Sequence, residues 1–160
     1  MFIDHAMRDK GKPIVILIAD DDEEDRMLAC DALTESRLAN EVFCVEDGEE
    51  LMDYLKHKGK YGPPAEAPRP GIILLDLNMP RKDGREALRE IKADPMLRQI
   101  PVVVMTTSKA DQDIARSYDE GASSFISKAV TFEGLIDVMK GLGRYWFEIV
   151  ELPSQEERGE

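Results

Sequence analysis

The chain has 160 residues, 42% of them hydrophobic, with a formal net charge of −12 and an isoelectric point of about 4.7. This length suits one compact domain with a single hydrophobic core. The negative charge repels nucleic-acid phosphates and anionic membrane surfaces, which argues against binding to either. No apolar stretch is long enough to span a membrane and no N-terminal signal core is present, which predicts a soluble, cytoplasmic protein.

Short runs of apolar and β-branched residues predict five strands. They lie at Ile14–Ala19, Val42–Val45, Ile72–Leu75, Val102–Met105 and Ser123–Ser127. Segments with helical spacing are found from Asp22 to about Ser36, at Gly48–Lys58, from Gly84 to about Ala93, at Lys109–Glu120 and from Thr131 onward. Residues 1–12 are expected to form a flexible tail, residues 13–152 one domain with a C-terminal helical extension, and residues 153–160 a disordered tail.

The alternation of strands and helices predicts an α/β fold. Strands that alternate with helices of this size form βαβ units with a parallel sheet and right-handed crossovers. In such sheets, ligands bind beyond the carboxyl ends of the strands. Polar residues that directly follow the predicted strands are therefore the candidates for a functional site.

Polar residues follow four of the five predicted strands. The first strand ends at Asp20 and Asp21, and the third ends at Asp76. The fourth ends at Thr106, and the fifth runs into Lys128. Each has a simpler interpretation alone: a helix cap for the first aspartates, a turn residue, a strand-end hydroxyl and a solvated lysine. Because all of them fall at the same edge of one sheet, these separate explanations weaken together.

Three carboxylates at one edge repel one another strongly unless a cation lies between them. Oxygen ligands without a nearby His or Cys suit Mg²⁺. A carboxylate can also attack phosphorus, and phosphoryl transfer then needs mainly positioning and neutralisation of oxygen charge. Mg²⁺, the Lys128 ammonium and the Thr106 hydroxyl are candidates for that neutralisation.

With these residues in view, the chain resembles the receiver domain of bacterial response regulators from about Ile14 to Leu142. The fragments ILIADDD, ILLDLNMPRKDG, PVVVMTTSKA and GASSFISK carry the resemblance. Any one fragment is a weak signal, but the set is highly specific. The resemblance implies a flavodoxin-like, doubly wound five-stranded parallel sheet with strand order 2-1-3-4-5 and helices on both faces.

The resemblance also implies roles for the acidic residues. Asp76 matches the phosphoacceptor aspartate of the family. Asp21 matches the carboxylate that binds Mg²⁺ directly, and Asp20 matches the one that helps to hold its water. The backbone carbonyl of Asn78 matches a further metal ligand. The protein is then a signalling switch that assists its own Mg²⁺-dependent phosphorylation and dephosphorylation, and is not a true enzyme.

Three residues near the other strand ends match the switch machinery of the family. Thr106 matches the switch hydroxyl, Phe125 the switch aromatic, and Lys128 the lysine that contacts the phosphoryl oxygens. The family usually has a cis proline after this lysine, whereas this chain has Ala129. A cis bond before a residue other than proline costs about 2.5–4 kcal/mol, so both the cis and trans peptides, and the reach of Lys128, stay open.

Two other functions compete with the signalling switch. Phosphatases and phosphomutases that form an aspartyl-phosphate on a similar sheet typically carry a second Asp two residues after the nucleophile. Asn78 occupies that position here, which argues against this class. A receiver that only binds partners is the other alternative; the complete acidic set argues against it, whereas Ala129 leaves it open.

Within the family, the chain resembles single-domain regulators that are paired with phytochrome-type histidine kinases. The segments IILLDLNMPRKDGRE and GRYWFEIVELP carry this resemblance, which implies a sensor histidine kinase as the partner. It also implies a homodimer through the C-terminal helix and its extension. Apolar residues in excess of one helix face support this expectation: Tyr145, Phe147, Val150 and Leu152. The alternative is that the extension folds back on its own subunit.

The remaining metal-ligating residue types carry little signal. Cys30 and Cys44 sit in apolar patterns, which favours reduced thiols with a structural role. His5 and His57 have no ligand partner at a useful spacing.

Overall fold

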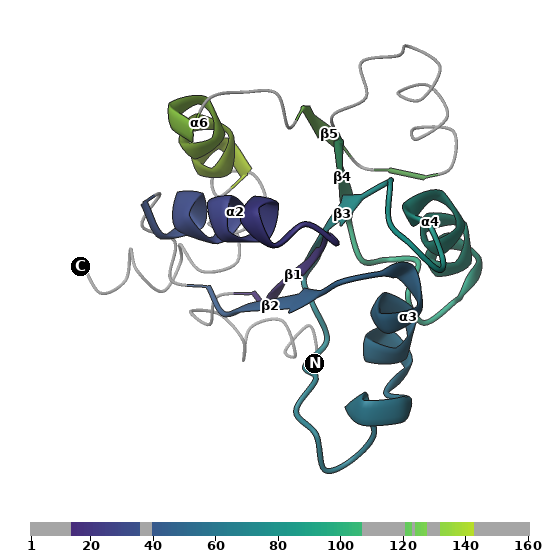
Figure 1. The fold of residues 1–160 in the computed structure, drawn as a ribbon. Coiled ribbons are helices and arrows are strands. Elements are labelled where there is room, and N and C mark those ends of the chain that lie inside the picture. Colours follow the sequence, from purple (N-terminus) through teal and green to yellow (C-terminus); the bar gives the residue numbers. More distant parts are fainter. Residues whose placement is uncertain (1–13, 36–39, 107–120, 123, 128–131, 143–160) are drawn as a thin grey trace, which may run out of the picture.

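The structure is a computed structural model that describes residues 14–35, 40–106, 121–122, 124–127 and 132–142 (Figure 1). Its centre is a five-stranded parallel sheet in the order β2-β1-β3-β4-β5. The strands are β1 Ile16–Ala19, β2 Val42–Val45, β3 Ile72–Asp76, β4 Val102–Thr106 and β5 Ser124–Ser127. The predicted α/β class and the strand order 2-1-3-4-5 are therefore confirmed.

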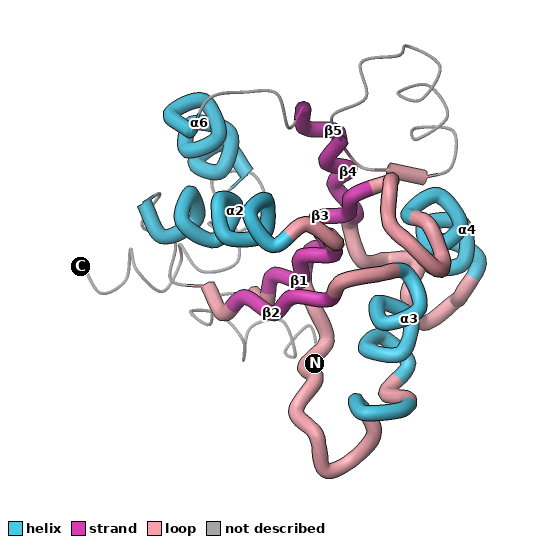
Figure 2. The backbone as a smooth tube through the Cα atoms, in the orientation of Figure 1, coloured by secondary structure: helices cyan, strands magenta, loops and turns pink. Residues whose placement is uncertain are grey.

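Helices cover both faces of the sheet (Figure 2). One face carries α2 Glu23–Glu35 and α6 Phe132–Leu142, which pack against each other. The other carries α3 Gly48–Lys56 and α4 Gly84–Ala93, and the short 3-10 helix η1 Gly59–Tyr61 follows α3. Among the described helices, none is both long and apolar enough to cross a membrane.

The apolar residues of the strands contribute to two hydrophobic cores, one on each face of the sheet. Along β3, Ile73 and Leu75 pack with residues of α3 and α4, whereas Ile72 and Leu74 pack with residues of α2 and α6. Side chains of a strand alternate between faces, so a strand covered on both sides must be apolar throughout. All four side chains are fully buried, and each such burial contributes about 1.5–3 kcal/mol.

The register of the sheet brings the strand ends to one level. Ala19 of β1 pairs with Leu75 of β3, so the next residues along the chain, Asp20 and Asp76, end adjacent strands side by side. Asp76 in turn pairs with Met105 of β4. The sheet thus places the two aspartates at the same carboxyl edge, as parallel topology requires.

Some predicted boundaries differ from the structure. β1 begins at Ile16 instead of Ile14, and α3 ends at Lys56 because His57 adopts a left-handed conformation with φ of 56°. The backbone amides of His57 and Lys58 bond back to carbonyls of α3, which closes the helix. The predicted helix at 109–120 and both tails lie outside the described residues.

Candidate functional site

Three of the predicted site residues come together at the carboxyl edge of the sheet. Asp20, Asp21 and Asp76 each offer a carboxylate oxygen, and these oxygens lie within 4.8 Å of one another. Asp20 and Asp76 are buried, with 3% and 5% of their surface exposed, while Asp21 faces solvent. Residues 56 positions apart in the chain therefore form one acidic cluster.

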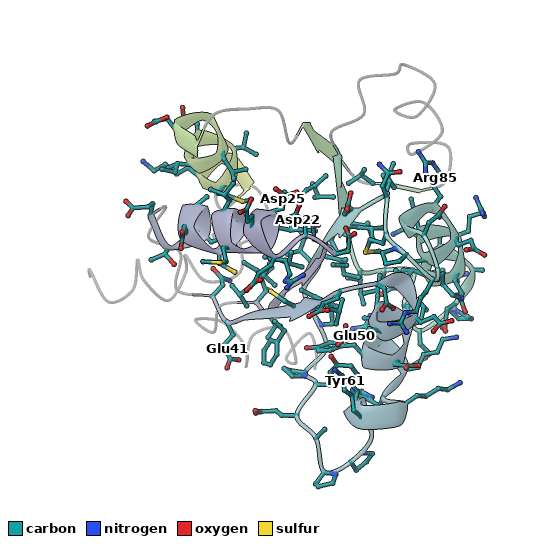
Figure 3. All side chains as sticks on the ribbon, in the orientation of Figure 1. Asp22, Asp25, Glu41, Glu50, Tyr61 and Arg85 are labelled. Carbon is teal, nitrogen blue, oxygen red and sulfur yellow. The ribbon has the colours of Figure 1, made fainter. Side chains whose placement is uncertain are left out.

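The hydrogen bonds at this edge of the sheet distinguish the residue that caps α2 from the residues of the acidic cluster. Asp22 Oδ1 accepts bonds from the backbone amides of Glu24 and Asp25 at 2.8 and 3.1 Å, so it caps the N-terminus of α2. Figure 3 places Asp22 and Asp25 at the start of that helix. Because one aspartate is enough to cap α2, capping does not explain the presence of Asp21.

Asp20 is fixed by the turn that leads into α2. Its Oδ1 accepts a 3.0 Å hydrogen bond from the backbone amide of Asp22. Its backbone amide donates to the carbonyl of Val45 on β2 at 3.1 Å, which extends the sheet by one residue. The carboxylate is thus buried at a defined position next to β3.

Asp76 is held where β3 turns towards α4. Its Oδ1 accepts a hydrogen bond of 3.3 Å from the backbone amide of Asn78, and Gly84 donates its amide to the carbonyl of Leu77 at 2.9 Å. A Cβ atom on Gly84 would lie 2.2 Å from the backbone oxygen of Asp76. Only glycine fits at this point, so the start of α4 packs directly against the backbone of Asp76.

The geometry and charge of the cluster fit a small divalent cation. Mg²⁺–oxygen bonds are about 2.0–2.1 Å long, so two oxygens on one ion are separated by at most about 4.2 Å. Carboxylates already within 4.8 Å of one another need only a small closure to share such an ion. Burial of two of the three removes water that would otherwise screen their repulsion, which favours a bound cation.

The structure describes the remaining predicted site residues only in part. Asn78 is exposed on the loop that follows Asp76, and its backbone amide donates to the Asp76 carboxylate. Thr106 ends β4 and pairs with Ser127, and Phe125 of β5 pairs with Val104, but neither side chain belongs to the described part of the chain. Lys128, Ala129 and the proposed dimer segment from residue 143 onward lie outside the described residues.

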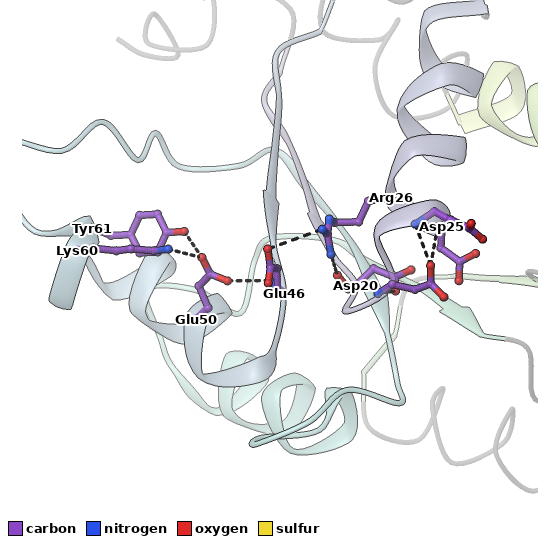
Figure 4. A network of polar contacts seen from close by, with 9 residues as sticks. Asp20, Asp25, Arg26, Glu46, Glu50, Lys60 and Tyr61 are labelled. Atoms are coloured by element: carbon purple, nitrogen blue, oxygen red, sulfur yellow. Dashed lines mark hydrogen bonds and ion pairs between the residues drawn. The ribbon is translucent and has the colours of Figure 1, made fainter.

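Sequence reasoning missed Arg26. Its Nη1 donates a 2.8 Å hydrogen bond to the backbone carbonyl of Asp20, and its Nη2 lies 3.7 Å from Oε2 of Glu46 (Figure 4). The backbone amide of Glu46 donates to Glu50, which also contacts Lys60 and Tyr61. The one available signal was that Arg26 is the first cation after six consecutive acidic residues.

A second ion pair connects the loop after Asp76 to the start of α3. Arg81, with φ of 65°, places its Nε 3.3 Å from Oδ2 of Asp47, the residue that caps α3. A Cβ atom on Gly48 would lie 2.0 Å from the carbonyl oxygen of Lys82, so this loop lies directly on the first turn of α3. The sequence pattern contains no signal for this contact, because the partners lie in separate loops.

The sequence and fold of the chain are similar to those of known proteins. Residues 16–140 match the family model of the response regulator receiver domain. Response regulator Rcp1 of Synechocystis sp. is 38% identical over 146 residues, which cover 91% of this chain and 97% of that protein. The similarity therefore extends over nearly the whole length of both sequences.

Solved structures give the same picture. The phosphorylated cyanobacterial phytochrome response regulator RcpA is 44% identical with a TM-score of 0.75, over 83% of this chain and 93% of that one. The Mn²⁺-bound form of response regulator Rcp1 is 39% identical with a TM-score of 0.76, over 85% and 96% of the two chains. One similar protein has thus been observed with a phosphoryl group and another with a divalent metal.

Proposed function

The chain belongs to the family of response regulator receiver domains, and on that premise we propose that it accepts a phosphoryl group on Asp76 beside a bound Mg²⁺. The observation that carries this assignment is the set of three carboxylate oxygens within 4.8 Å at the carboxyl edge of the sheet. Members of this family are signalling switches, not classical enzymes. The output of the switch is then a change in protein–protein contact, in the cytoplasm.

Asp20 and Asp21 would hold Mg²⁺, together with Asp76 and the backbone carbonyl of Asn78. When bound, the ion neutralises charge on the phosphoryl oxygens and on the nucleophile. An oxygen of the Asp76 carboxylate attacks phosphorus as the bond from phosphorus to the donor breaks, and the electron pair of that bond leaves with the donor. Asp76 is 5% exposed, so the surrounding fold limits the directions from which a donor can reach its carboxylate.

Lys128 and Thr106 complete the proposed site on the basis of the family resemblance. The ammonium of Lys128 would contact the phosphoryl oxygens, and the hydroxyl of Thr106 would bond to them after transfer. Phe125 would then move inward into the space that Thr106 leaves. This movement is the proposed link between phosphorylation and the surface formed by β5 and the elements around it.

The proposed donor is the phosphohistidine of a sensor histidine kinase of the phytochrome type. Support for this partner comes from Rcp1 and RcpA, because RcpA is described as a phytochrome response regulator and both resemble this chain along nearly their whole length. We also propose a homodimer through α6 and the segment that follows it. Neither nucleic acid nor a membrane is proposed as a partner, because the chain carries a net charge of −12.

The test is phosphorylation of the full chain by acetyl phosphate, followed by intact-mass measurement with and without Mg²⁺. The proposal predicts a gain of one phosphoryl group that requires Mg²⁺ and that is lost in Asp76→Asn. Asp22→Asn is the matched control, because asparagine also caps helices well and Asp22 is outside the cluster. A chain that gains no phosphoryl group with Mg²⁺ present would instead be a receiver that only binds partners.

A further inference from the structure

Two cysteines occur in the whole sequence, and the fold brings them together. Cys30 lies on α2 and is half-buried, and Cys44 lies on the edge strand β2 and is exposed. The two side chains lie within hydrogen-bonding reach of each other, and this contact is the largest influence on the pKa of each thiol. The apolar sequence pattern around each cysteine favours reduced, structural thiols.

The contact follows from how α2 packs on β2. Four residues of a helix advance about 6 Å, and two residues of a strand advance about 6.6 Å. Arg26 and Cys30 are one turn apart on α2. They therefore match Cys44 of β2 and Glu46, which directly follows that strand two positions later. The Arg26–Glu46 ion pair at 3.7 Å is one contact between these two segments, and the thiol pair is the next contact along them.

The surroundings of the pair activate one thiol over the other. The hydrogen bond from Cys44 lowers the pKa of Cys30 to about 7; burial and Asp31 act against this shift, and Arg26 adds to it. The same bond and burial raise the pKa of Cys44 well above its ordinary value, with Asp20 adding to the rise and Arg26 opposing it. We assign the role of nucleophile to Cys30, whose pKa is the lower of the two, and Cys44 is the thiol that solvent reaches.

We propose that Cys30 and Cys44 form a redox-sensitive dithiol, which a peroxide converts to a disulfide that joins α2 to the edge strand β2. The proposal stands on the juxtaposition of two thiols from separate elements and does not depend on phosphoryl transfer. Cys30 is only half-buried and its partner is exposed on an edge strand, so a small oxidant can reach the pair.

The chemistry proceeds in two balanced steps. The Cys30 thiolate attacks one peroxide oxygen, an S–O bond forms as the O–O bond breaks, and the released hydroxide takes a proton to become water. The Cys44 sulfur then attacks the sulfenic acid of Cys30, its proton leaves with the displaced hydroxide as a second water, and the S–S bond forms. Cys44 is free to react at that point, because the thiolate that raised its pKa no longer exists.

The disulfide would act on the candidate site through Arg26. This residue lies one turn before Cys30 and holds the backbone carbonyl of Asp20 at 2.8 Å. A covalent link at Cys30 fixes the first turns of α2 against β2, and with them the loop that carries Asp20 and Asp21. Oxidation is therefore expected to change the affinity of the carboxylate cluster for Mg²⁺ while leaving every ligand in place.

The direct test treats the full chain with a small excess of hydrogen peroxide and measures intact mass without reductant. The expected result is a loss of two hydrogen atoms per chain, a fall from two free thiols to none, and a peptide that joins Cys30 to Cys44. The oxidised chain should unfold at a higher urea concentration than the reduced chain, and a reductant should reverse the change. Calorimetric titration with Mg²⁺ then compares the two forms.

Substitutions at Cys44 separate the dithiol from two independent thiols. Cys44→Ala removes the hydrogen-bond donor, so alkylation of Cys30 at neutral pH should slow at least several-fold; Cys44→Ser keeps a donor and should retain much of the rate. In either variant, peroxide should leave a sulfenic acid on Cys30 that a dione reagent traps. Retention of both thiols, disulfides only between chains, or equal alkylation rates in Cys44→Ala and the unchanged protein would each overturn the proposal.

Discussion

Arg26 Nη1 donates a hydrogen bond of 2.8 Å to the backbone carbonyl of Asp20, and this bond fastens the first turns of α2 to the acidic edge of the sheet. The Arg26 side chain is 16% exposed, so the bond is shielded from most of the solvent. Asp20 therefore has its backbone held by α2 and its carboxylate held by the turn before it.

Loss of this bond should destabilise the fold measurably. Arg26→Met keeps much of the side-chain stem but leaves the Asp20 carbonyl without this donor, so we expect a loss of about 1.5–3 kcal/mol, the range for bonds to charged groups. Urea denaturation measures it. Arg69→Met is the matched control, because Arg69 donates a similar bond of 2.7 Å to the carbonyl of Met96 at an exposed site and should cost much less. Equal losses in both variants would contradict the structural role of Arg26.

Substitution of two neighbouring aspartates, Asp21 and Asp22, should distinguish metal binding from helix capping. Asp21→Ala removes an exposed carboxylate from the cluster, so it should weaken Mg²⁺ binding about tenfold or more with little effect on stability. Asp22→Ala removes the cap of α2, so it should cost about 1 kcal/mol and leave Mg²⁺ affinity largely unchanged. Calorimetric titration and thermal unfolding of both variants check the contrast. Loss of Mg²⁺ affinity in Asp22→Ala alone would reverse the two assignments.

Glycine positions provide a test of the packing around Asp76. In Gly84→Ala the new methyl group would meet the Asp76 carbonyl oxygen at 2.2 Å, so α4 must shift, at a cost of about 1–3 kcal/mol. Gly141→Ala is the matched control in α6, because a Cβ atom there has no neighbour within 4 Å and alanine favours helix by up to about 1 kcal/mol. Chemical denaturation should therefore show opposite signs for the two changes, and a neutral Gly84→Ala would refute the close approach.

Stability at acid pH should depend on Glu50. Burial opposes its ionisation, but hydrogen bonds from Tyr61, the Glu46 amide and Lys60 outweigh burial and hold its pKa below the ordinary 4.5. A lowered folded pKa contributes stability that is present above the unfolded value and is lost as the pH falls through the folded value. Glu50→Gln should therefore lower stability at neutral pH and flatten its dependence on pH below 4.5. Parallel curves for the two proteins in unfolding experiments across that range would contradict the argument.

Much of the fold was accessible from sequence because its pattern follows simple rules. Strands such as β3 are apolar at every position because both of their faces are covered, and the parallel topology sends the next polar residue, Asp76, to the carboxyl edge. The strand order came from the family resemblance, since periodicity does not specify which strands are neighbours.

The contacts that sequence reasoning missed are long-range ones. Arg26 to Glu46, Arg81 to Asp47 and Cys30 to Cys44 each join separate elements, and each depends on the register between those elements. The role of Asp22 as the cap also emerged only from the hydrogen bonds, because three successive aspartates are indistinguishable by pattern. The sequence therefore predicted which edge of the sheet bears the acidic cluster. The structure identified the ion pairs and hydrogen bonds that hold the loops around it.

Identification of the phosphorylated residue tests whether Asp76 is the phosphoacceptor. After treatment with acetyl phosphate and Mg²⁺, borohydride reduces an aspartyl-phosphate to homoserine, and peptide mapping by mass spectrometry then locates the reduced residue. Homoserine is expected at position 76 alone, and none is expected in a sample that lacks Mg²⁺ or carries Asp76→Asn. Homoserine at Asp20 or Asp21, or an unmodified peptide around Asp76 in a chain that has gained a phosphoryl group, would contradict it.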